Sequence, residues 1–346
     1  MISTKDDARC LLGCLLLGIL ILPGCGGQPK GHGHGETQPK KIERFQGEYP
    51  IKVTVTVGMV ADLVREIGGD YVEVTQLMGT GVDPHLYTAT RDDSAAILRA
   101  DLVLYNGLLL EGKMSEILGG GKTPSKAVAE SLPKSMLTQD PEMEGHPDPH
   151  VWMDVSLWAR VADGVTDTLI AFDPEHSWEF QENGKRVSYR LNALDSWGRE
   201  LMQTIPEQRR VLVTSHDAFR YFGSAYGLEV QAVQGISTDS EAGLHRINEL
   251  VDMLAERKIA AVFVESSVPK ESIESLVEGT KRKGHEIKIG GSLFSDAMGA
   301  EGTYEGTYVG MMEHNLSTIA KALGGEVPED GFEYGRAMSE SESAGE

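Results

Sequence analysis

The chain has 346 residues, with 53 acidic side chains against 32 basic ones and a formal net charge of −21. A surface that binds nucleic acid needs clustered Lys and Arg, so we expect no nucleic-acid partner for so acidic a chain. The hydrophobic content of 40% is enough to bury cores, and the length predicts two domains or one large one.

The N-terminus has the features of an export signal. Residues 11–22 are almost wholly apolar, a stretch too short for a comfortable membrane span and typical of a signal-peptide core. Next comes Leu22-Pro23-Gly24-Cys25, which resembles the bacterial lipobox, whose cysteine is lipidated and becomes the first mature residue. We therefore expect residues 1–24 to be a signal peptide and Cys25 to anchor the exported protein to the membrane, in the periplasm or at the cell surface. An ordinary cleaved signal peptide is the alternative, because Pro23 stands where the lipobox has a small or aliphatic residue.

The cysteine positions favour lipidation. All three cysteines, Cys10, Cys14 and Cys25, lie in this segment, so a mature chain that begins at Cys25 keeps one. Such a chain can form no internal disulfide and no cysteine metal site. A lone free thiol would be unusual in an exported protein, whereas a lipidated cysteine would not.

Both ends of the mature chain are predicted to be flexible. Residues 25–50 are rich in Gly, Pro, Lys and Gln, which predicts a tether. The tether contains His32 and His34, and a short His tract can hold metal weakly, although a solvated linker is the interpretation we prefer. Residues 326–346 are acidic, rich in Ser and Gly and poor in apolar side chains, which predicts a disordered acidic tail.

Between these ends, strands alternate with helices, a pattern that predicts an α/β fold with parallel sheets. We expect an N-terminal α/β lobe over residues 51–172, with strands at 52–57, 71–77 and 102–105 and helices at 60–67 and 91–100. The pattern restarts in a C-terminal α/β lobe over residues 207–325. Its expected strands are 211–214, 228–233, 260–264 and 286–289, and its expected helices are 217–226, 240–258, 272–283 and 308–323.

One long helix is predicted to join the two lobes, within residues 173–206. Asp173-Pro174 is a good N-cap and first-turn pair, and Pro206 ends the segment. Apolar side chains at Val187, Leu191 and Leu194 keep a helical period between those ends.

Four side chains stand where such a fold binds ligands. Open α/β sheets bind ligands outside the carboxyl ends of their strands. His85 follows the strand expected at 71–77, His216 follows the one at 211–214, and Asp296 follows the one at 286–289. His150 ends an Asp-Pro-His triplet that repeats the one ending at His85. Because His is the commonest metal ligand, these positions indicate a metal site in the cleft between the lobes, although they lack the compact His-Glu-x-x-His pattern.

The motifs of the chain, taken in order, closely resemble those of the TroA-like zinc/manganese solute-binding proteins of ABC importers. The likeness covers about residues 52–323, which is all but the two ends. The segments that carry it are Asp83-Pro84-His85, residues 148–154 (DPHVWMD), residues 211–219 (VLVTSHDAF), residues 262–266 (VFVES), residues 290–297 (GGSLFSDA), Gly306-Thr307-Tyr308 and His314-Asn315.

The resemblance implies one transported Zn²⁺ or Mn²⁺ ion between the lobes. By carry-over, His85 and His150 are the ligands from the first lobe, and His216 and Asp296 are those from the second. Glu265 also lies in a family motif, where a supporting hydrogen bond is expected of it. The expected partners are the divalent ion and the membrane permease of an ABC importer, and we expect a monomer. Relatives with Glu at the position of His216 look like manganese importers, whereas this chain has the nitrogen-rich set.

Two other functions were considered. A zinc metallohydrolase would keep an open coordination position beside a general base, and the sequence has no base motif, so we expect no enzyme. A surface adhesin, a label that relatives have carried, would also suit a lipid anchor but would give the buried ligands no purpose. His146 lies in a short loop before His150, whereas zinc-dedicated relatives often have a long His-rich loop there. Structural or surface roles are expected for His176, His245, His285 and His314.

Overall fold

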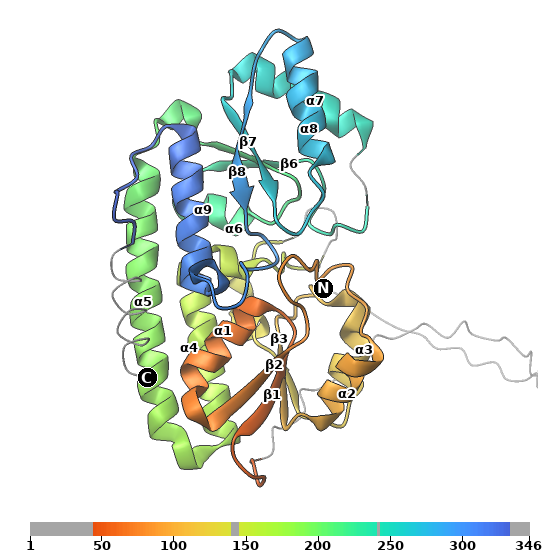
Figure 1. Cartoon of the computed structure of the whole chain (residues 1–346), viewed down its shortest axis with the longest axis vertical. Helices are drawn as coiled ribbons and strands as arrows, with labels where there is room; N and C mark the ends of the chain where they lie inside the picture. The colour runs from red at the N-terminus through yellow and green to blue at the C-terminus, as the bar shows by residue number, and fades with distance from the viewer. Residues whose placement is uncertain (1–43, 140–144, 241–242, 333–346) are drawn as a thin grey trace, which may run out of the picture. The chain divides into compact units, whose positions relative to one another are not determined.

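A computed structural model describes residues 44–139, 145–240 and 243–332 of the chain. The predicted signal peptide, Cys25, His32, His34 and most of the acidic tail lie outside these residues. The described part has two α/β lobes with parallel strands flanked by helices, which confirms the predicted fold class (Figure 1). None of its helices is both long and apolar enough to cross a bilayer.

The first lobe is built on a four-stranded parallel sheet in the order β2-β1-β3-β4. Its strands are β1 (Ile51–Val55), β2 (Val72–Gln76), β3 (Leu102–Tyr105) and β4 (Ser125–Ala127). Helix α1 (Gly58–Gly68) covers one face, and α2 (Arg91–Arg99) and α3 (Ser115–Gly120) cover the other (Figure 1). Helix α2 begins at a capping box, in which Thr90 and Asp93 each accept a hydrogen bond from the backbone N–H of the other.

The second lobe has two parallel strand pairs instead of one continuous ladder. In one pair β5 (Val211–Thr214) bonds to β6 (Glu229–Ala232), and in the other β7 (Ala261–Glu265) bonds to β8 (Lys288–Leu293). Strand β5 lies beside β7, which brings the two pairs together. The helices are α6 (Arg220–Tyr226), α7 (Leu244–Arg257), α8 (Glu271–Arg282) and α9 (Tyr308–Leu323).

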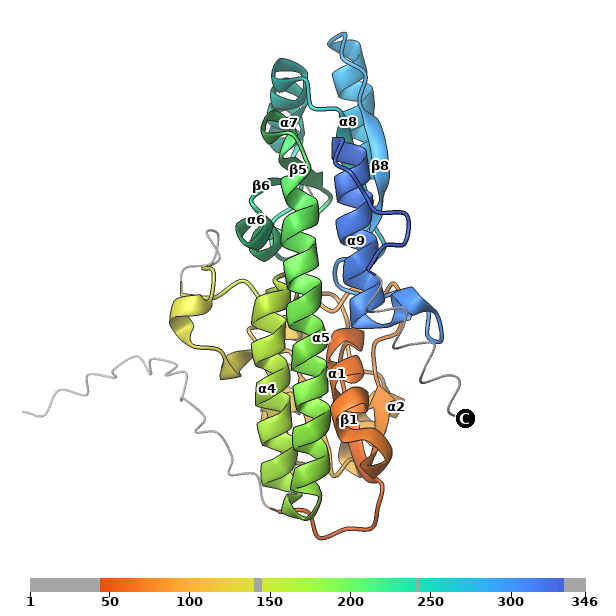
Figure 2. The same cartoon turned by 90° about the vertical axis from the view of Figure 1, so that its left-hand side faces the viewer.

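The predicted joining helix is α5 (Ser177–Gln203), which follows a 3-10 turn at Pro174–His176. Asp173, predicted to cap the long helix, caps this turn instead: its side chain accepts the N–H of Glu175 at 3.2 Å, and α5 itself begins three residues later than Pro174. Helix α5 packs against α1 and α4 (Val155–Phe172) of the first lobe and against α6 and α9 of the second, so it runs along both (Figure 2). Residues 155–172, for which the sequence pattern predicts no element, form α4, a helix with buried positions in every turn.

One hydrophobic core is shared by the two lobes. It includes Trp152 and Trp158 from the first lobe and Phe219, Phe222 and Tyr308 from the second, all at most 2% exposed. A smaller core lies between the second lobe's strands and helices α7 and α8, and includes Val213, Val262, Leu254 and Ile273. The lobes are therefore joined through a continuous apolar interior as well as through α5.

The chain stays attached to the second lobe beyond the expected start of the tail. Phe332 is only 4% exposed, and its ring lies 5.7 Å from that of Trp197 on α5. Its backbone N–H donates to Glu313 on α9 at 2.9 Å, and the N–H of Glu326 donates to Thr204. Residues 326–332 thus differ from the predicted disorder, because a single aromatic side chain in a polar segment finds a buried position.

Candidate metal centre

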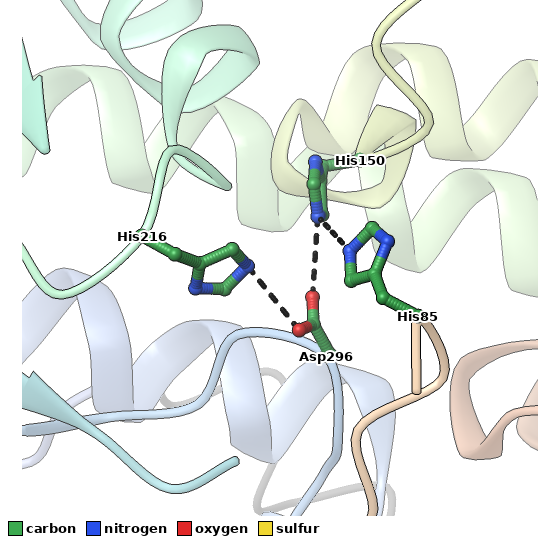
Figure 3. Close-up of side chains that lie close together, drawn as sticks. All are labelled: His85, His150, His216 and Asp296. Atoms are coloured by element: carbon green, nitrogen blue, oxygen red, sulfur yellow. Dashed lines mark hydrogen bonds and ion pairs between the residues drawn. The ribbon is translucent and has the colours of Figure 1, made fainter. Parts of the chain in front are cut away.

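The structure brings His85, His150, His216 and Asp296 together where the two lobes meet. One ligand atom from each lies within 4.8 Å of the other three (Figure 3). The Nε2 atoms of His85 and His150 are 3.2 Å apart. The carboxylate of Asp296 lies between the rings of His150 and His216. Its Oδ1 is 3.3 Å from Nε2 of His150, and its Oδ2 is 3.2 Å from Nε2 of His216.

The fold explains why residues so far apart in sequence meet here. His85 lies in the loop after β2, His216 follows β5, and Asp296 follows β8, so each comes from the carboxyl end of a parallel strand. His150 comes from the turn before the short 3-10 helix Val151–Met153. The carboxyl ends of the strands in each lobe therefore face the junction, as the sequence predicts.

His150 is oriented by the aspartate of its own Asp-Pro-His triplet. Oδ1 of Asp148 accepts the backbone N–H of His150 at 2.9 Å and lies 2.8 Å from its ring Nδ1. This contact assigns the proton of the neutral ring to Nδ1 and leaves the Nε2 lone pair aimed at the centre. The carbonyl of Asp148 in turn accepts the hydroxyl of Tyr221 from the second lobe at 3.0 Å.

His216 is oriented in the same way by Glu265, at the end of β7. Oε1 of Glu265 accepts the backbone N–H of His216 at 2.9 Å, and Oε2 lies 2.5 Å from its ring Nδ1. The hydroxyl of Thr214 donates to the carbonyl of His216 at 2.9 Å, which fixes the backbone further. Glu265 thus contacts His216 and lies outside the cluster of four, and its supporting role stays a prediction.

Asp296 is held through the backbone just before it. The indole N–H of Trp152 donates to the carbonyl of Ser295 at 2.9 Å. The side chain of Asn315 on α9 accepts the N–H of Phe294 at 2.9 Å and donates to its carbonyl at 2.7 Å. This pair of bonds fixes the chain just before Asp296.

The electrostatics of the buried centre favour a positive charge on it. Burial alone would lower the pKa of His150, but Asp148 and Asp296 outweigh it and raise that pKa to about 9. Burial acts in the same direction on His216, and Glu265 and Asp296 outweigh it to raise its pKa as well. Burial would raise the pKa of Asp296, yet the two neighbouring histidines hold it well below its usual range. The set of carboxylates therefore stabilises a cation here, whether protons on imidazole or a bound metal ion.

His85 differs from the other two histidines in both exposure and charge. It is 6% exposed, whereas His150 and His216 are fully buried. Burial lowers the pKa of His85 to about 3, so its ring is neutral at pH 7 and ready to donate a lone pair.

The remaining described histidines lie outside the cluster. His245 is exposed on α7 beside Glu249, and His176 contacts Asp173. The Nε2 atoms of His285 and His314 lie at hydrogen-bond distance from the backbone carbonyls of Ile259 and Ser292, respectively. His146 shares a cavity with His85 but does not join the four.

Two direct contacts near the site are not predicted from the sequence: that of Asp148 with the ring of His150, and that of Thr238 with Asp83. For Asp148 the sequence carries a signal, because this aspartate stands two residues before His150 in the Asp-Pro-His triplet. For Thr238 the sequence carries no signal, since its partner lies 155 positions away.

Comparison with known proteins finds close relatives. Residues 53–322 match the family described as Zinc-uptake complex component A periplasmic. The chain is 46% identical over 316 residues to the manganese-binding lipoprotein MntA of Bacillus subtilis, covering 90% of this chain and 98% of that protein. It is 48% identical over 276 residues to the zinc-binding protein TroA of Treponema pallidum, covering 79% and 89% respectively. The solved structure of the Treponema pallidum periplasmic zinc-binding protein TroA has a TM-score of 0.77 to this one, at 46% identity, covering 80% of this chain and 99% of that chain.

Proposed function

This chain belongs to the family of zinc-uptake complex component A, and from that premise we propose that it captures a zinc or manganese ion outside the cytoplasm and delivers it to the permease of an ABC importer. We infer that one ion is bound by His85, His150, His216 and Asp296. The observation that carries this assignment is the convergence of four buried ligand atoms within 4.8 Å.

The donor set suits both candidate metals. Three imidazole nitrogens and one carboxylate oxygen can close a tetrahedral zinc site, and a bidentate Asp296 makes the site five-coordinate. One close relative is named as manganese-binding and another as zinc-binding. Nitrogen ligation and the Irving–Williams order favour zinc in a test tube, so we expect tighter binding of zinc than of manganese in vitro. The cargo in the cell can still be manganese, because metal availability as well as affinity selects it.

The same residues support capture better than catalysis. A catalytic zinc keeps one position for water, usually beside a general base. Here four protein side chains complete the set, and the two nearest supporting carboxylates, Asp148 and Glu265, lie against ring nitrogens of His150 and His216. The family is named for metal uptake and not for a reaction.

We further propose that Cys25 is lipidated and that the protein acts as a membrane-anchored monomer. The lipobox-like segment supports the lipid anchor, as does the naming of a close relative as a lipoprotein. Cys25→Ala should move the protein from the membrane fraction to the soluble fraction. Mass spectrometry of the wild type should find a lipidated Cys25 as first residue, and an unmodified N-terminus elsewhere would contradict the anchor.

Calorimetric titration with zinc tests the ligand assignment. We expect one ion per chain, and His150→Ala and Asp296→Ala should each lower affinity by more than the about 10- to 100-fold that loss of an outer partner costs. His245→Ala is the matched control, because it also removes an imidazole but from an exposed helix face. Equal losses of zinc affinity in the ligand variants and in the control would contradict the ligand assignment. Elemental analysis of protein purified without added metal then identifies the cargo.

A further inference from the structure

The three histidines of the proposed site are not supported in the same way. The rings of His150 and His216 each have a carboxylate at Nδ1, Asp148 at 2.8 Å and Glu265 at 2.5 Å. Asp83, the aspartate of the other Asp-Pro-His triplet, bonds to the backbone N–H of His85 at 2.8 Å and not to its ring. In the described part of the chain, Nδ1 of the His85 ring has no hydrogen-bond partner. The position of His85 therefore depends on the loop that carries it.

That loop is held from the opposite lobe. The hydroxyl of Thr238, in the loop between β6 and α7, donates to Oδ2 of Asp83 at 2.6 Å. Asp83 thus uses one oxygen for the backbone of His85 and the other for Thr238. Its carboxylate connects a proposed ligand of the first lobe to a loop of the second, and both Asp83 and Thr238 are partly buried.

The base of the same second-lobe loop is fixed to the segment that carries His216. The N–H of Gln234 donates to the carbonyl of Ser215 at 2.9 Å, and the N–H of Asp217 donates to the carbonyl of Gly235 at 3.2 Å. Ile236, between this base and Thr238, is buried at 5% exposure. The neighbours of His216 are therefore connected to the backbone of His85 through two hydrogen bonds at the base of the loop, the chain from Gly235 to Thr238, and the Thr238–Asp83 and His85–Asp83 hydrogen bonds.

The loop also borders a cavity beside the most exposed of the four proposed ligands. This cavity has a volume of about 220 Å³, and its lining includes His85, Leu108, Ile236, Ser237 and Asp239. Thr238 lies between two of the lining residues. A shift of this loop would therefore change the exposure of His85 to solvent through this cavity.

We propose that Thr238 is a positioning residue for His85 and controls the rate at which the bound ion leaves. It acts through Asp83: while the Thr238–Asp83 hydrogen bond is made, the loop holds the His85 ring at the centre. When the bond breaks, His85 can withdraw with its loop and leave the ion with three ligands, which speeds dissociation. This inference rests on the proposed role of His85 as a ligand.

Release of zinc from the loaded protein into an excess of colorimetric chelator, followed by stopped-flow absorbance, tests this role. Thr238→Val keeps the shape of the side chain and removes the hydroxyl, and we expect release to become about tenfold faster, the lower end of the range for an outer partner. Thr238→Ser keeps the hydroxyl and should release zinc at the wild-type rate. Ser240→Ala is the matched control in the same loop, because it also removes a hydroxyl but from an exposed residue whose printed contact, with Gln234, is through its backbone carbonyl, and it should leave the rate unchanged.

The same substitution made in a His85→Ala protein separates a positioning role of Thr238 from a general structural effect. In a His85→Ala protein, adding Thr238→Val should change the release rate no further, because the residue that Thr238 positions is gone. An equal acceleration in both backgrounds, or no acceleration in the wild-type background, would overturn the inference. In either case the proposed function stands so long as His85→Ala itself weakens zinc binding. If His85→Ala leaves the affinity unchanged, the ligand assignment fails and this inference fails with it.

Discussion

The two lobes meet along two sides that differ in burial and in chemistry. On the helix side, the indole of Trp152 bonds to Ser295 of the second lobe, and the hydroxyl of Tyr308 on α9 donates to the carbonyl of Trp152 at 2.6 Å, all within the shared core. On the loop side, Thr238 bonds to Asp83, and Lys113 pairs with Asp239 at 2.9 Å with both side chains about half exposed.

The difference indicates which part of the junction can move. Separation of the helix side would expose large apolar side chains and leave buried polar groups without partners, both of which are costly. Separation of the loop side breaks a few polar contacts that water can replace. We therefore expect α4, α5 and α9 to remain fixed when the ion binds or leaves, while the loops around His85 and Thr238 shift. We therefore predict that closure is a small tilt with loop ordering, and scattering curves with and without zinc should nearly superimpose.

The largest effect is expected on the helix side, from Trp152→Ala. The side chain is fully buried, and its loss leaves a cavity and an unpaired carbonyl at Ser295. We expect the free energy of unfolding of the metal-free protein to fall by about 3–5 kcal/mol. Chemical denaturation measures this, with Trp178→Ala as a control, because Trp178 is 68% exposed on α5 and its removal should cost no more than about 0.5 kcal/mol. Similar losses in the two variants would remove the distinction between the sides.

Tyr308→Phe tests a single bond of the helix side. The substitution keeps the ring, which stacks on Trp158, and deletes the hydroxyl that donates to the carbonyl of Trp152. That carbonyl is then left buried without this donor, so we expect a loss of about 1–3 kcal/mol in the free energy of unfolding. Tyr71→Phe is the control, since within the described residues the Tyr71 hydroxyl makes no hydrogen bond and the ring contacts are kept. Equal effects of the two changes would argue against the Tyr308 bond as a joint between lobes.

The sequence predicts the local parts of this architecture and not its long-range contacts. Strand β3 and helix α9 lie at the predicted residues, because their apolar patterns and end signals are local. Helix α4 is not among the predicted elements, although its buried side chains recur at a helical spacing, at Val155, Trp158, Ala162, Val165 and Leu169, so a local signal for it is present in the sequence. Strand β8 begins at Lys288, later than expected, and includes Gly290 and Gly291, which pattern reasoning assigns to a turn.

The candidate site, too, is predicted from the sequence in its local features but not in its long-range contacts. The positions of His85, His216 and Asp296 after strands are visible in the sequence, and the structure brings them together with His150. What the sequence cannot give is the difference between the two Asp-Pro-His triplets. Asp148 reaches its own histidine ring, whereas Asp83 is turned towards Thr238 of the other lobe. Identical triplets take different roles because the tertiary contacts around them differ.

The carboxylate of Asp62 adds a pH dependence to the helix side. Asp62 on α1 accepts the N–H of Tyr308, at the start of α9, at 2.9 Å. Its pKa is raised to about 7, first because burial disfavours the charged form and then because Glu66 lies nearby. An unfolded Asp titrates near about 3.9, so between about pH 4 and 7 the folded protein keeps a proton that the unfolded chain has lost. The contribution of Asp62 to stability is therefore complete below about pH 4 and is lost as the pH rises through about 7.

Asp62→Asn keeps an oxygen for the N–H of Tyr308 and cannot ionise. Relative to the wild type, the variant should gain stability as the pH rises from 4 to 7, because the wild type loses the contribution of its protonated Asp62 over that range. We expect a gain on the order of 1 kcal/mol at neutral pH, which is small because Asp62 is only partly buried and water screens its charge. Denaturation curves at several pH values measure the difference. Asp70→Asn, which removes an exposed carboxylate, is the matched control. A difference that shrinks towards neutral pH would mean that the sign of this linkage is wrong.

The smallest effect is expected on the loop side, from the ion pair between Lys113 and Asp239. Its side chains are 40% and 54% exposed, so water screens the charges and the pair pays side-chain entropy to form. We expect Lys113→Ala to change the free energy of unfolding by no more than about 0.5 kcal/mol, and the coupling energy from a double-mutant cycle with Asp239→Ala to fall below about 1 kcal/mol. Denaturation in low and high salt measures both, and added salt should reduce the coupling further. A coupling of several kcal/mol would show that this pair fastens the lobes as firmly as the buried bonds of Trp152. The loop side would then be a second fixed joint, and release of the ion would need a movement of the whole lobe instead of its loops.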